Sequence, residues 1–304
     1  MNAALIKLIS IIADSLQVKF ENPTLCTQYA WWLLQKVTNK TELQLINQEN
    51  NILDDEQKKI LDEYINELVN NNMPLAYLLG NTPFCGLDIM VRSPILIPRA
   101  ETEEWCADLI DSLKQAKQEQ LWILDLCTGT GCIALALADA LPKAKVIGTD
   151  NNPAAIALAQ ENANHNSLNN VEFIISDVWS AIPAHFTFDI IVANPPYISP
   201  HLWHTLEADV QDWEDKNALI ADDAGLALIK KIIINARNYL KKNDTFARYA
   251  IPQLVIEIDH TQANAVQEIM KQYGFAVEIK KDLQKKDRVA CGRLDNVAIT
   301  AGSK

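Results

Sequence analysis

The first part of the chain carries apolar side chains at helical spacing. Such residues recur three or four positions apart in three successive groups, which begin at Leu5, Leu25 and Ile60. This period is typical of amphipathic helices that turn one face toward a shared core. Asp54 and Asp55 precede the third group, where side-chain acceptors for the first free N–H groups of a helix are expected. We therefore predict a small helical domain over residues 1–80.

The helical pattern ends near residue 74. Prolines and glycines then interrupt the chain as far as residue 98, and the apolar runs between them are short. This composition predicts a hairpin or an extended linker rather than another helix. We place the linker at residues 81–104 and the domain boundary within it.

Beyond the linker, short apolar runs alternate with helical patterns. Strands are predicted over residues 121–126, 146–149, 171–175, 188–193, 253–258, 276–279 and 288–292. Helices are predicted over residues 132–141, 153–166, 226–240 and 262–273. Such alternation predicts an α/β fold with a largely parallel, Rossmann-like sheet covered on both faces, and we place this second domain at residues 105–297. Ligand sites in these sheets lie at the carboxyl ends of the strands.

The composition narrows the class of protein. With 304 residues, 49% of them hydrophobic and 22% charged, the chain can bury a sizeable core, which excludes disordered and collagen-like classes. The net charge of −12 repels phosphate backbones and disfavours a duplex-DNA partner. The six cysteines form no CxxC pair, no signal-like segment opens the chain, and the apolar runs are too short to span a bilayer. We expect a cytoplasmic protein with reduced thiols, no membrane segment and no bound metal.

A glycine-rich turn follows the strand predicted over residues 121–126. It reads DLCTGTG over residues 125–131, so Gly129 and Gly131 lie between a strand and a helix, where bare backbone can approach a ligand. Asp150 ends the next strand, and a carboxylate there can accept hydrogen bonds from both hydroxyls of a ribose. The same spacing suits NAD and S-adenosylmethionine. The turn alone therefore predicts a nucleoside ligand, with a tight turn that binds nothing as the alternative.

A second motif, Asn194-Pro195-Pro196-Tyr197, directly follows the strand predicted over residues 188–193. The two prolines fix φ and remove two backbone N–H donors. The Asn194 side-chain oxygen and the Pro195 carbonyl can together accept both hydrogens of an NH₂ group, which would favour a pyramidal nitrogen whose lone pair points at an electrophile. Tyr197 offers a flat face to a planar group. The motif thus predicts chemistry on a planar NH₂ group, with a bland turn as the alternative.

Together the two motifs resemble those of the amino-methyltransferases that use S-adenosylmethionine. Within them the chain is similar to the HemK/PrmC family of release factor glutamine N5-methyltransferases. Further matches lie at residues 74–80, 84–86, 96–103, 218–219, 225–226, 257–258, 262, 281–282 and 287–289. The resemblance implies a class I S-adenosylmethionine methyltransferase sheet preceded by a small helical substrate-docking domain.

The resemblance also implies a role for each motif residue. The methionine part of S-adenosylmethionine would be wrapped by Cys127, Thr128, Gly129, Thr130 and Gly131. Asp150 would hold the ribose, and Asp177 would border the adenine beside either Val178 or Trp179. Asn194 would touch both cofactor and substrate. The glutamine amide would be gripped by Asn194, Pro195, Pro196 and Tyr197, of which Asn194, Pro195 and Tyr197 would be catalytic.

The activity that the resemblance implies is methylation of the side-chain amide N5 of the glutamine in the Gly-Gly-Gln motif of peptide chain release factors. A glutamine methyltransferase acting on a ribosomal protein would use the same chemistry. A DNA adenine N6-methyltransferase shares the Asn-Pro-Pro-Tyr motif, but the net charge of −12 argues against stable DNA binding. A NAD-dependent oxidoreductase would leave that motif unexplained. A non-catalytic adaptor would not require both Asn194 and Asp150.

Two further groups of residues have a plain structural interpretation. His201 and His204 follow the second motif, but methyl transfer to an amide requires no general base there. The basic residues between Lys280 and Arg288 predict a solvated hairpin. Contact of this hairpin with a partner protein or with rRNA is the alternative.

Overall fold

The computed structural model describes residues 2–48, 52–115, 120–242, 246 and 249–295, and the chain divides into two compact units. The first unit comprises Met1–Asn81 with Glu207–Trp213, and the second comprises Thr82–Leu206 with Glu214–Lys304. The hydrophobic pattern gave no signal that the segment Glu207–Trp213 belongs with the first unit. Residues 296 and 297, at the end of the predicted second domain, lie outside the described residues.

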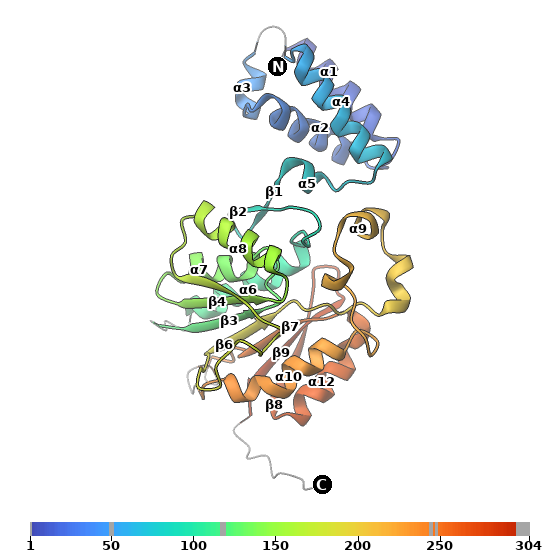
Figure 1. Ribbon diagram of the computed structural model, residues 1–304. Helices are drawn as coiled ribbons and strands as arrows, with labels where there is room; N and C mark the ends of the chain where they lie inside the picture. Colours follow the sequence, from blue (N-terminus) through green and yellow to red (C-terminus); the bar gives the residue numbers. More distant parts are fainter. Residues whose placement is uncertain (1, 49–51, 116–119, 243–245, 247–248, 296–304) are drawn as a thin grey trace. The chain divides into compact units, whose positions relative to one another are not determined.

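Helices packed around an apolar core make up the first unit. They are α1 (Ala3–Leu16), α2 (Pro23–Thr38), α3 (Glu42–Ile46), α4 (Asp55–Asn70), α5 (Leu75–Leu79) and α9 (Ala208–Trp213) (Figure 1). The start of α4 shows why the helices begin where they do. The Asp54 side chain accepts the Gln57 N–H while the Gln57 side chain accepts the Asp54 N–H, so a capping box confirms the predicted N-cap. Fully buried leucines and isoleucines, including Leu5, Ile12 and Leu68, hold the helices together.

In the second unit, the described residues place seven strands in one mixed sheet. The strands are β3 (Trp122–Leu126), β4 (Lys145–Asp150), β5 (Val171–Ile175), β6 (Ile190–Ala193), β7 (Leu254–Glu257), β8 (Phe275–Lys281) and β9 (Asp287–Leu294). Their order is β5-β4-β3-β6-β7-β9-β8. The first five strands in this order are parallel, as predicted, and β9 runs antiparallel to both of its neighbours. A separate small hairpin is formed by β1 (Asn81–Phe84) and β2 (Leu87–Met90).

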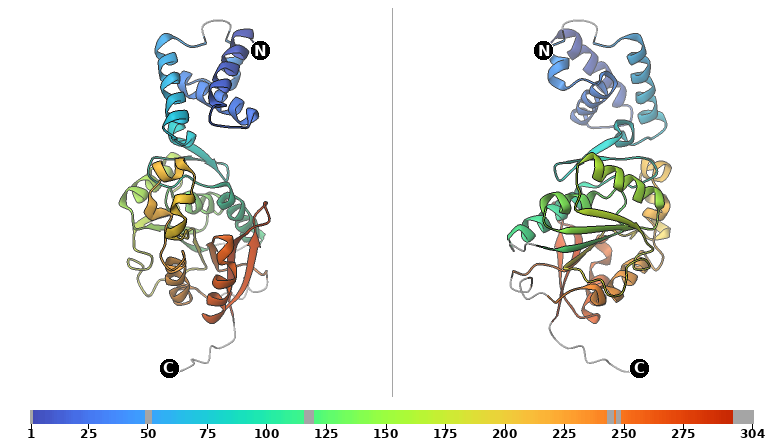
Figure 2. Two further views of the ribbon diagram at one scale, coloured as in Figure 1. Left: turned by 90° about the vertical axis from the view of Figure 1, so that its right-hand side faces the viewer. Right: turned by 60° about the vertical axis from the view of Figure 1, so that its left-hand side comes forward.

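Both faces of the large sheet are buried under helices (Figure 2). Because successive side chains of a strand point to opposite faces, Ile123 packs in the cluster with α6 (Ala100–Gln115) and α7 (Cys132–Ala140), while Leu124 packs in the other. That second cluster includes side chains of α10 (Ala227–Tyr239) and α12 (Ala263–Gln272). Helix α8 (Pro153–His165) belongs to the same unit. The two layers explain why the strands read as continuous apolar runs rather than alternating ones.

The register of the strands brings the two predicted motifs to the same edge of the sheet. Leu126 of β3 pairs with Thr149 of β4 and with Ala193 of β6, and Ala193 pairs with Ile256 of β7. The residues that follow these strands therefore meet at one edge of the sheet.

Some elements lack a counterpart in the predicted pattern. Helix α6 begins at Ala100, so residues 100–104 of the predicted linker are helical. The 3₁₀ turns η1 (Pro200–Thr205) and η2 (Lys216–Ala218) lie between the predicted strand at residues 188–193 and α10, and η3 (His260–Gln262) precedes α12. Among the described helices, none has both the length and the apolar character needed to cross a membrane.

Candidate active site

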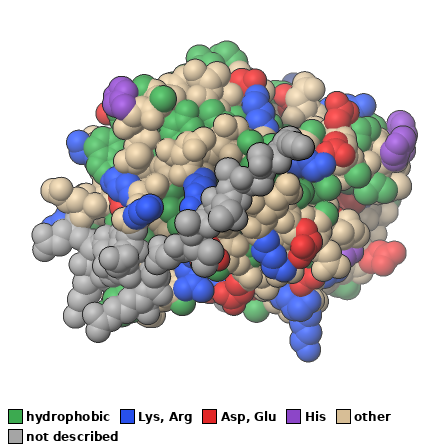
Figure 3. All heavy atoms as spheres, turned by 90° about the horizontal axis from the view of Figure 1, so that it is seen from below, with side chains coloured by type: hydrophobic (Ala, Val, Ile, Leu, Met, Phe, Trp, Pro, Cys, Tyr) green, Lys and Arg blue, Asp and Glu red, His purple; other side chains and the backbone are tan. Residues whose placement is uncertain are grey.

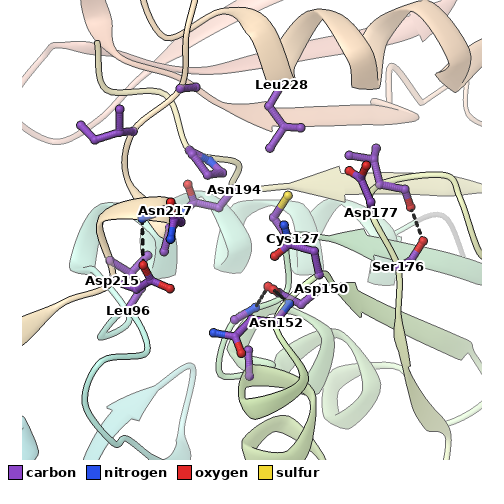
Figure 4. A pocket seen from close by; sticks show the side chains of 18 of the residues that line it. Leu96, Cys127, Asp150, Asn152, Ser176, Asp177, Asn194, Asp215, Asn217 and Leu228 are labelled. Atoms are coloured by element: carbon purple, nitrogen blue, oxygen red, sulfur yellow. Dashed lines mark hydrogen bonds between the residues drawn. The ribbon is translucent and has the colours of Figure 1, made fainter. Parts of the chain in front are cut away.

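A pocket of about 350 Å³ lies at the carboxyl ends of β3, β4 and β6 (Figure 4). This volume falls within the range of small-molecule sites. Its polar lining includes Asp150 and Asn194, each of which directly follows or ends one of these strands. Its apolar lining includes Ile95, Leu96, Ala155, Val178, Ile220 and Leu228. The pocket thus combines apolar walls with a few convergent polar groups.

The two glycines of the DLCTGTG turn have different roles in this structure. Gly129 lines the pocket with φ +55°, and a Cβ added there would meet no atom within 4 Å. Gly131 has φ +83°, and a Cβ there would lie 2.9 Å from the Ala159 Cβ and 3.0 Å from the Phe173 Cζ. Gly131 therefore allows the turn to pack against α8 and β5, and only Gly129 presents bare backbone to the pocket.

Asp150 is held in place by the neighbouring backbone. Its Oδ2 accepts the Gly129 N–H at 3.0 Å, and its Oδ1 accepts the Asn152 N–H at 2.9 Å (Figure 4). Burial raises the pKa of the Asp150 carboxyl, and the backbone N–H groups act in the opposite direction. Each carboxylate oxygen has a second lone pair, so the fixed side chain can still accept hydrogen bonds from the hydroxyls of a ligand.

The pocket lining is acidic. Four carboxylates line it, those of Asp150, Asp177, Asp215 and Asp222, and Lys231 is the one basic side chain among the described lining residues. Lys231 Nζ lies 2.7 Å and 2.8 Å from the two carboxylate oxygens of Asp177, so its charge is paired. An acidic, partly buried lining attracts a cationic ligand and opposes a pyrophosphate group.

The structure separates the two residues predicted beside an adenine. Val178 lines the pocket in a left-handed conformation, φ +52°, which is rare for a β-branched residue. The Ser176 hydroxyl donates to the Val178 carbonyl at 2.9 Å and holds this turn. The Trp179 ring instead stacks on the Tyr239 ring at 4.6 Å, and its Nε1 donates to the Lys231 carbonyl. The geometry favours Val178 over Trp179 as the residue that meets a ligand.

Of the Asn194–Tyr197 motif, Asn194 and Pro196 line the pocket, whereas Pro195 and Tyr197 are not part of its described lining. The Tyr197 ring packs against the core, and its hydroxyl donates to Glu257 Oε1 at 3.2 Å. The flat face expected to meet a substrate is thus not part of the pocket wall. The Tyr197 side chain instead anchors the motif to β7.

A glycine far along the chain packs against this motif. Gly225 has φ +83°, and a Cβ there would lie 1.9 Å from the Tyr197 carbonyl oxygen. The Gln262 side chain donates to the same oxygen at 2.8 Å and to the Ala224 carbonyl at 3.0 Å. The motif is therefore fixed by the segment before α10 and by η3, and any side chain at Gly225 would displace it.

Thr128 and Thr130, also predicted to bind the cofactor, stabilise the DLCTGTG turn through hydrogen bonds to neighbouring residues. The Thr128 hydroxyl donates to Asp125 Oδ2 at 2.5 Å, and the Thr130 carbonyl accepts a hydrogen bond from the Asn162 side chain. Neither threonine is among the pocket-lining residues, whereas Cys127 is. Burial raises the pKa of Asp125 to about 7, although Thr128 and the Ala134 N–H lower it. Burial likewise raises the pKa of the Cys127 thiol, which keeps it protonated.

Several residues of the site had not been predicted individually. Thr102 and Trp105 of α6 both donate to the buried carboxylate of Glu257, and Asn194 donates to Thr102. A signal existed for Glu257, because it is a lone acid that ends the apolar run LVI in a strand next to β6. Asp215 and Lys231 had no such signal, since only the folded chain brings them to the pocket.

The two histidines and the basic residues for which we predicted a structural role do not line the pocket. His201 and His204 are exposed on η1 and do not line it. The basic segment forms the hairpin of β8 and β9, in which Lys281 pairs with Asp287 and Arg288 with Asp282. Figure 3 shows basic and acidic side chains intermingled on the face it presents.

Comparison with known proteins gives independent evidence. The family model Methyltransferase small domain matches residues 106–208, and PrmC N-terminal domain matches residues 12–80. The release factor glutamine methyltransferase of Fusobacterium nucleatum is 35% identical over 269 residues, which cover 88% of this chain and 72% of the relative. That of Salmonella typhimurium is 36% identical over 262 residues, 86% of this chain and 90% of the relative. The hMettl16 catalytic domain, 17% identical with a TM-score of 0.53 over 71% of this chain and 78% of that chain, shares the fold.

Proposed function

Because this chain belongs to the family of release factor glutamine methyltransferases, we propose that it methylates the side-chain amide N5 of the glutamine in the Gly-Gly-Gln motif of peptide chain release factors, using S-adenosylmethionine. The observation that carries this proposal is the position of Asn194. Its side chain lies in the wall of an acidic pocket at the carboxyl edge of the sheet. There a side-chain amide substrate and a cationic cofactor can meet.

The pocket residues fit S-adenosylmethionine. The cofactor carries a sulfonium and an ammonium group, which suit the four carboxylates of the lining, and the open space at Gly129 admits a ligand against the backbone. Asp150 would hold the ribose, Cys127 and Gly129 the methionine part, and Asp177 with Val178 the adenine. When bound, the cofactor supplies an electrophilic methyl group. The acidic lining also argues against NAD, whose pyrophosphate it would repel.

The amide site would be formed by the first residues of the Asn194–Tyr197 motif, which Tyr197 anchors through its hydrogen bond to Glu257. Asn194 Oδ1 and the Pro195 carbonyl would accept the two hydrogens of the glutamine NH₂ group, and the two prolines keep these acceptors at a fixed spacing. Held in this way, the nitrogen lone pair is drawn out of amide resonance and directed along one line. Most of the rate enhancement would then come from orientation rather than from acid–base chemistry.

The first compact unit is the proposed docking site for the protein substrate. The PrmC N-terminal domain model matches residues 12–80, which form most of this unit. Release factors act on ribosomes in the cytoplasm, and we place the protein there. A docking unit of this kind would explain how the enzyme selects one glutamine in one class of protein.

A transfer experiment tests the proposal. The protein is incubated with methyl-labelled S-adenosylmethionine and, in separate reactions, with a release factor, a ribosomal protein and duplex DNA. Label is expected on the Gly-Gly-Gln glutamine of the release factor alone, located by mass spectrometry. Label on the ribosomal protein or on DNA, with none on the release factor, would overturn the proposed substrate.

A further inference from the structure

A buried carboxylate lies directly behind Asn194. Glu257 ends β7, and the parallel register of β6 and β7 makes Asn194 and Glu257 neighbours at the edge of the sheet. Glu257 is 1% exposed, and its Oε2 accepts hydrogen bonds from Thr102 Oγ1 at 2.7 Å and from Trp105 Nε1 at 2.8 Å. The two donors are three residues apart on one face of α6. Asn194 Nδ2 lies 3.2 Å from Thr102 Oγ1 and completes the chain of contacts.

The direction of each hydrogen bond follows from the groups present. Trp105 Nε1–H can only donate, so Glu257 Oε2 is an acceptor. The single hydrogen of the Thr102 hydroxyl goes to the same oxygen, and this leaves the hydroxyl oxygen as an acceptor for Asn194. If the Asn194 amide were rotated by 180°, its Oδ1 would face the Thr102 hydroxyl. Oδ1 and Glu257 Oε2 would then both require the single hydrogen of that hydroxyl. The network therefore selects one of the two amide orientations.

We infer that Thr102, held by Glu257, fixes the Asn194 amide so that Oδ1, and not Nδ2, faces the substrate. The inference rests on the proposed function, because a substrate NH₂ group requires an acceptor at this place, whereas the rotated amide would oppose donor to donor. Thr102 and Glu257 touch no reacting atom and are positioning residues. The other oxygen of Glu257 accepts the Tyr197 hydroxyl at 3.2 Å, so one carboxylate orients both ends of the Asn194–Tyr197 motif.

Removing the hydroxyl tests this role. Thr102→Val keeps the shape of the side chain and should lower kcat for release factor methylation about 10- to 100-fold, because the Asn194 amide loses its orienting acceptor. The KM for release factor and the Kd for S-adenosylmethionine should change much less. Thr102→Ser restores the hydroxyl and should recover most of kcat. Ser112→Ala removes a hydroxyl from the same helix, where it donates to the Asp108 carbonyl, and serves as the matched control.

A double-mutant cycle separates positioning from a general structural role. In an Asn194→Ala background Thr102→Val should cause no further fall in kcat, since the hydroxyl acts through Asn194. A multiplicative loss would overturn the inference, as would an unchanged kcat in Thr102→Val alone. Thr102→Ala, which adds no volume, is the second variant should Thr102→Val unfold, and the same results are expected. A wild-type enzyme that methylates no release factor would instead overturn the proposed function.

Discussion

Asn194 is the residue on which the proposed chemistry depends most. Asn194→Ala should lower turnover about 100- to 1000-fold, because one of the two acceptors for the amide hydrogens is lost where the transition state needs them. The Kd for S-adenosylmethionine, measured by calorimetry, should rise less than about tenfold. Asn235→Ala is a matched control, since that asparagine is half-buried on α10, does not line the pocket and donates to the Lys231 carbonyl. Near wild-type turnover in Asn194→Ala would contradict the amide-clamp mechanism.

Asp150 should act on cofactor binding instead. Asp150→Ala removes a charged acceptor for the ribose hydroxyls and should raise the Kd for S-adenosylmethionine about 10- to 100-fold. Titration calorimetry measures this directly. Asp223→Asn removes one negative charge from an exposed residue that pairs with Lys230, and it should leave the Kd nearly unchanged. Equal affinity in the wild type and in Asp150→Ala would refute the ribose assignment.

At the residue scale, the sequence identified the motifs that surround the pocket. It was less informative about which side chains within each motif face the pocket. Asn194, Asp150 and Gly129 line it, and each could be recognised because its motif ends a strand. Tyr197 and Trp179 could not be placed in the same way. An aromatic side chain beside a site can turn toward the ligand or toward the core, and only the packing partners, Tyr239 for Trp179 and the core beside β7 for Tyr197, decide which.

The turn between β3 and α7 allows a prediction at the scale of an element. Gly131→Ala forces a Cβ against Ala159 and Phe173 and should lower the free energy of unfolding by about 1–3 kcal/mol. Gly129→Ala meets open space, so its loss of stability should be smaller, about 1 kcal/mol, while its methyl group enters the pocket and weakens cofactor binding. Denaturant unfolding and calorimetry on both variants test the contrast. The opposite ranking of the two stability losses would contradict it.

The elements themselves were largely predictable, because buried parallel strands and amphipathic helices leave strong periodic signals. The strand predicted over residues 171–175 agrees with β5, and the order of strands and helices in the second unit is confirmed apart from α6 and the 3₁₀ turns. Sheet order could not be derived from the pattern alone. That β6 lies between β3 and β7 depends on which crossovers pack best, and this is why Glu257 could not be placed next to Asn194 from the sequence.

For the whole molecule, Asp125 predicts how stability depends on pH. Its pKa is about 7 in the folded protein and near 3.8 in the unfolded chain, so the folded state binds the additional proton between these values. Stability from this group is therefore present at low pH and is lost as the pH rises toward and above 7. Relative to Asp125→Asn, the wild type should lose about 2–3 kcal/mol of unfolding free energy between pH 5 and pH 8.

Denaturant unfolding of both proteins without cofactor, at pH 5 and pH 8, measures this difference. Asp282→Asn is the control, because hydrogen bonds to the Lys286 backbone N–H and to Arg288 lower the pKa of Asp282, which is then ionised in both states throughout this interval. The stability difference between that variant and the wild type should stay constant with pH. A constant difference for Asp125→Asn as well would show that burial does not protonate Asp125.

Family membership was also predictable from the two short motifs together with the further matches along the chain, and the relatives over most of the chain confirm it. Short motifs suffice because the chemistry restricts them: a bare backbone, a ribose acceptor and a rigid pair of amide acceptors tolerate few other residues. The contacts of Glu257 and Thr102 with Asn194 are harder to predict from the sequence, since the partners of a buried polar group can come from any neighbouring element.

The acidic lining of the pocket has a consequence for the turnover cycle. Methyl transfer converts a sulfonium into a neutral thioether, so the spent cofactor carries one positive charge fewer than the fresh one. The carboxylates of Asp150, Asp177, Asp215 and Asp222 therefore attract the spent molecule less strongly. The same charges that load the enzyme thus favour exchange of the used cofactor for a new one, and added salt should narrow the difference between the two affinities.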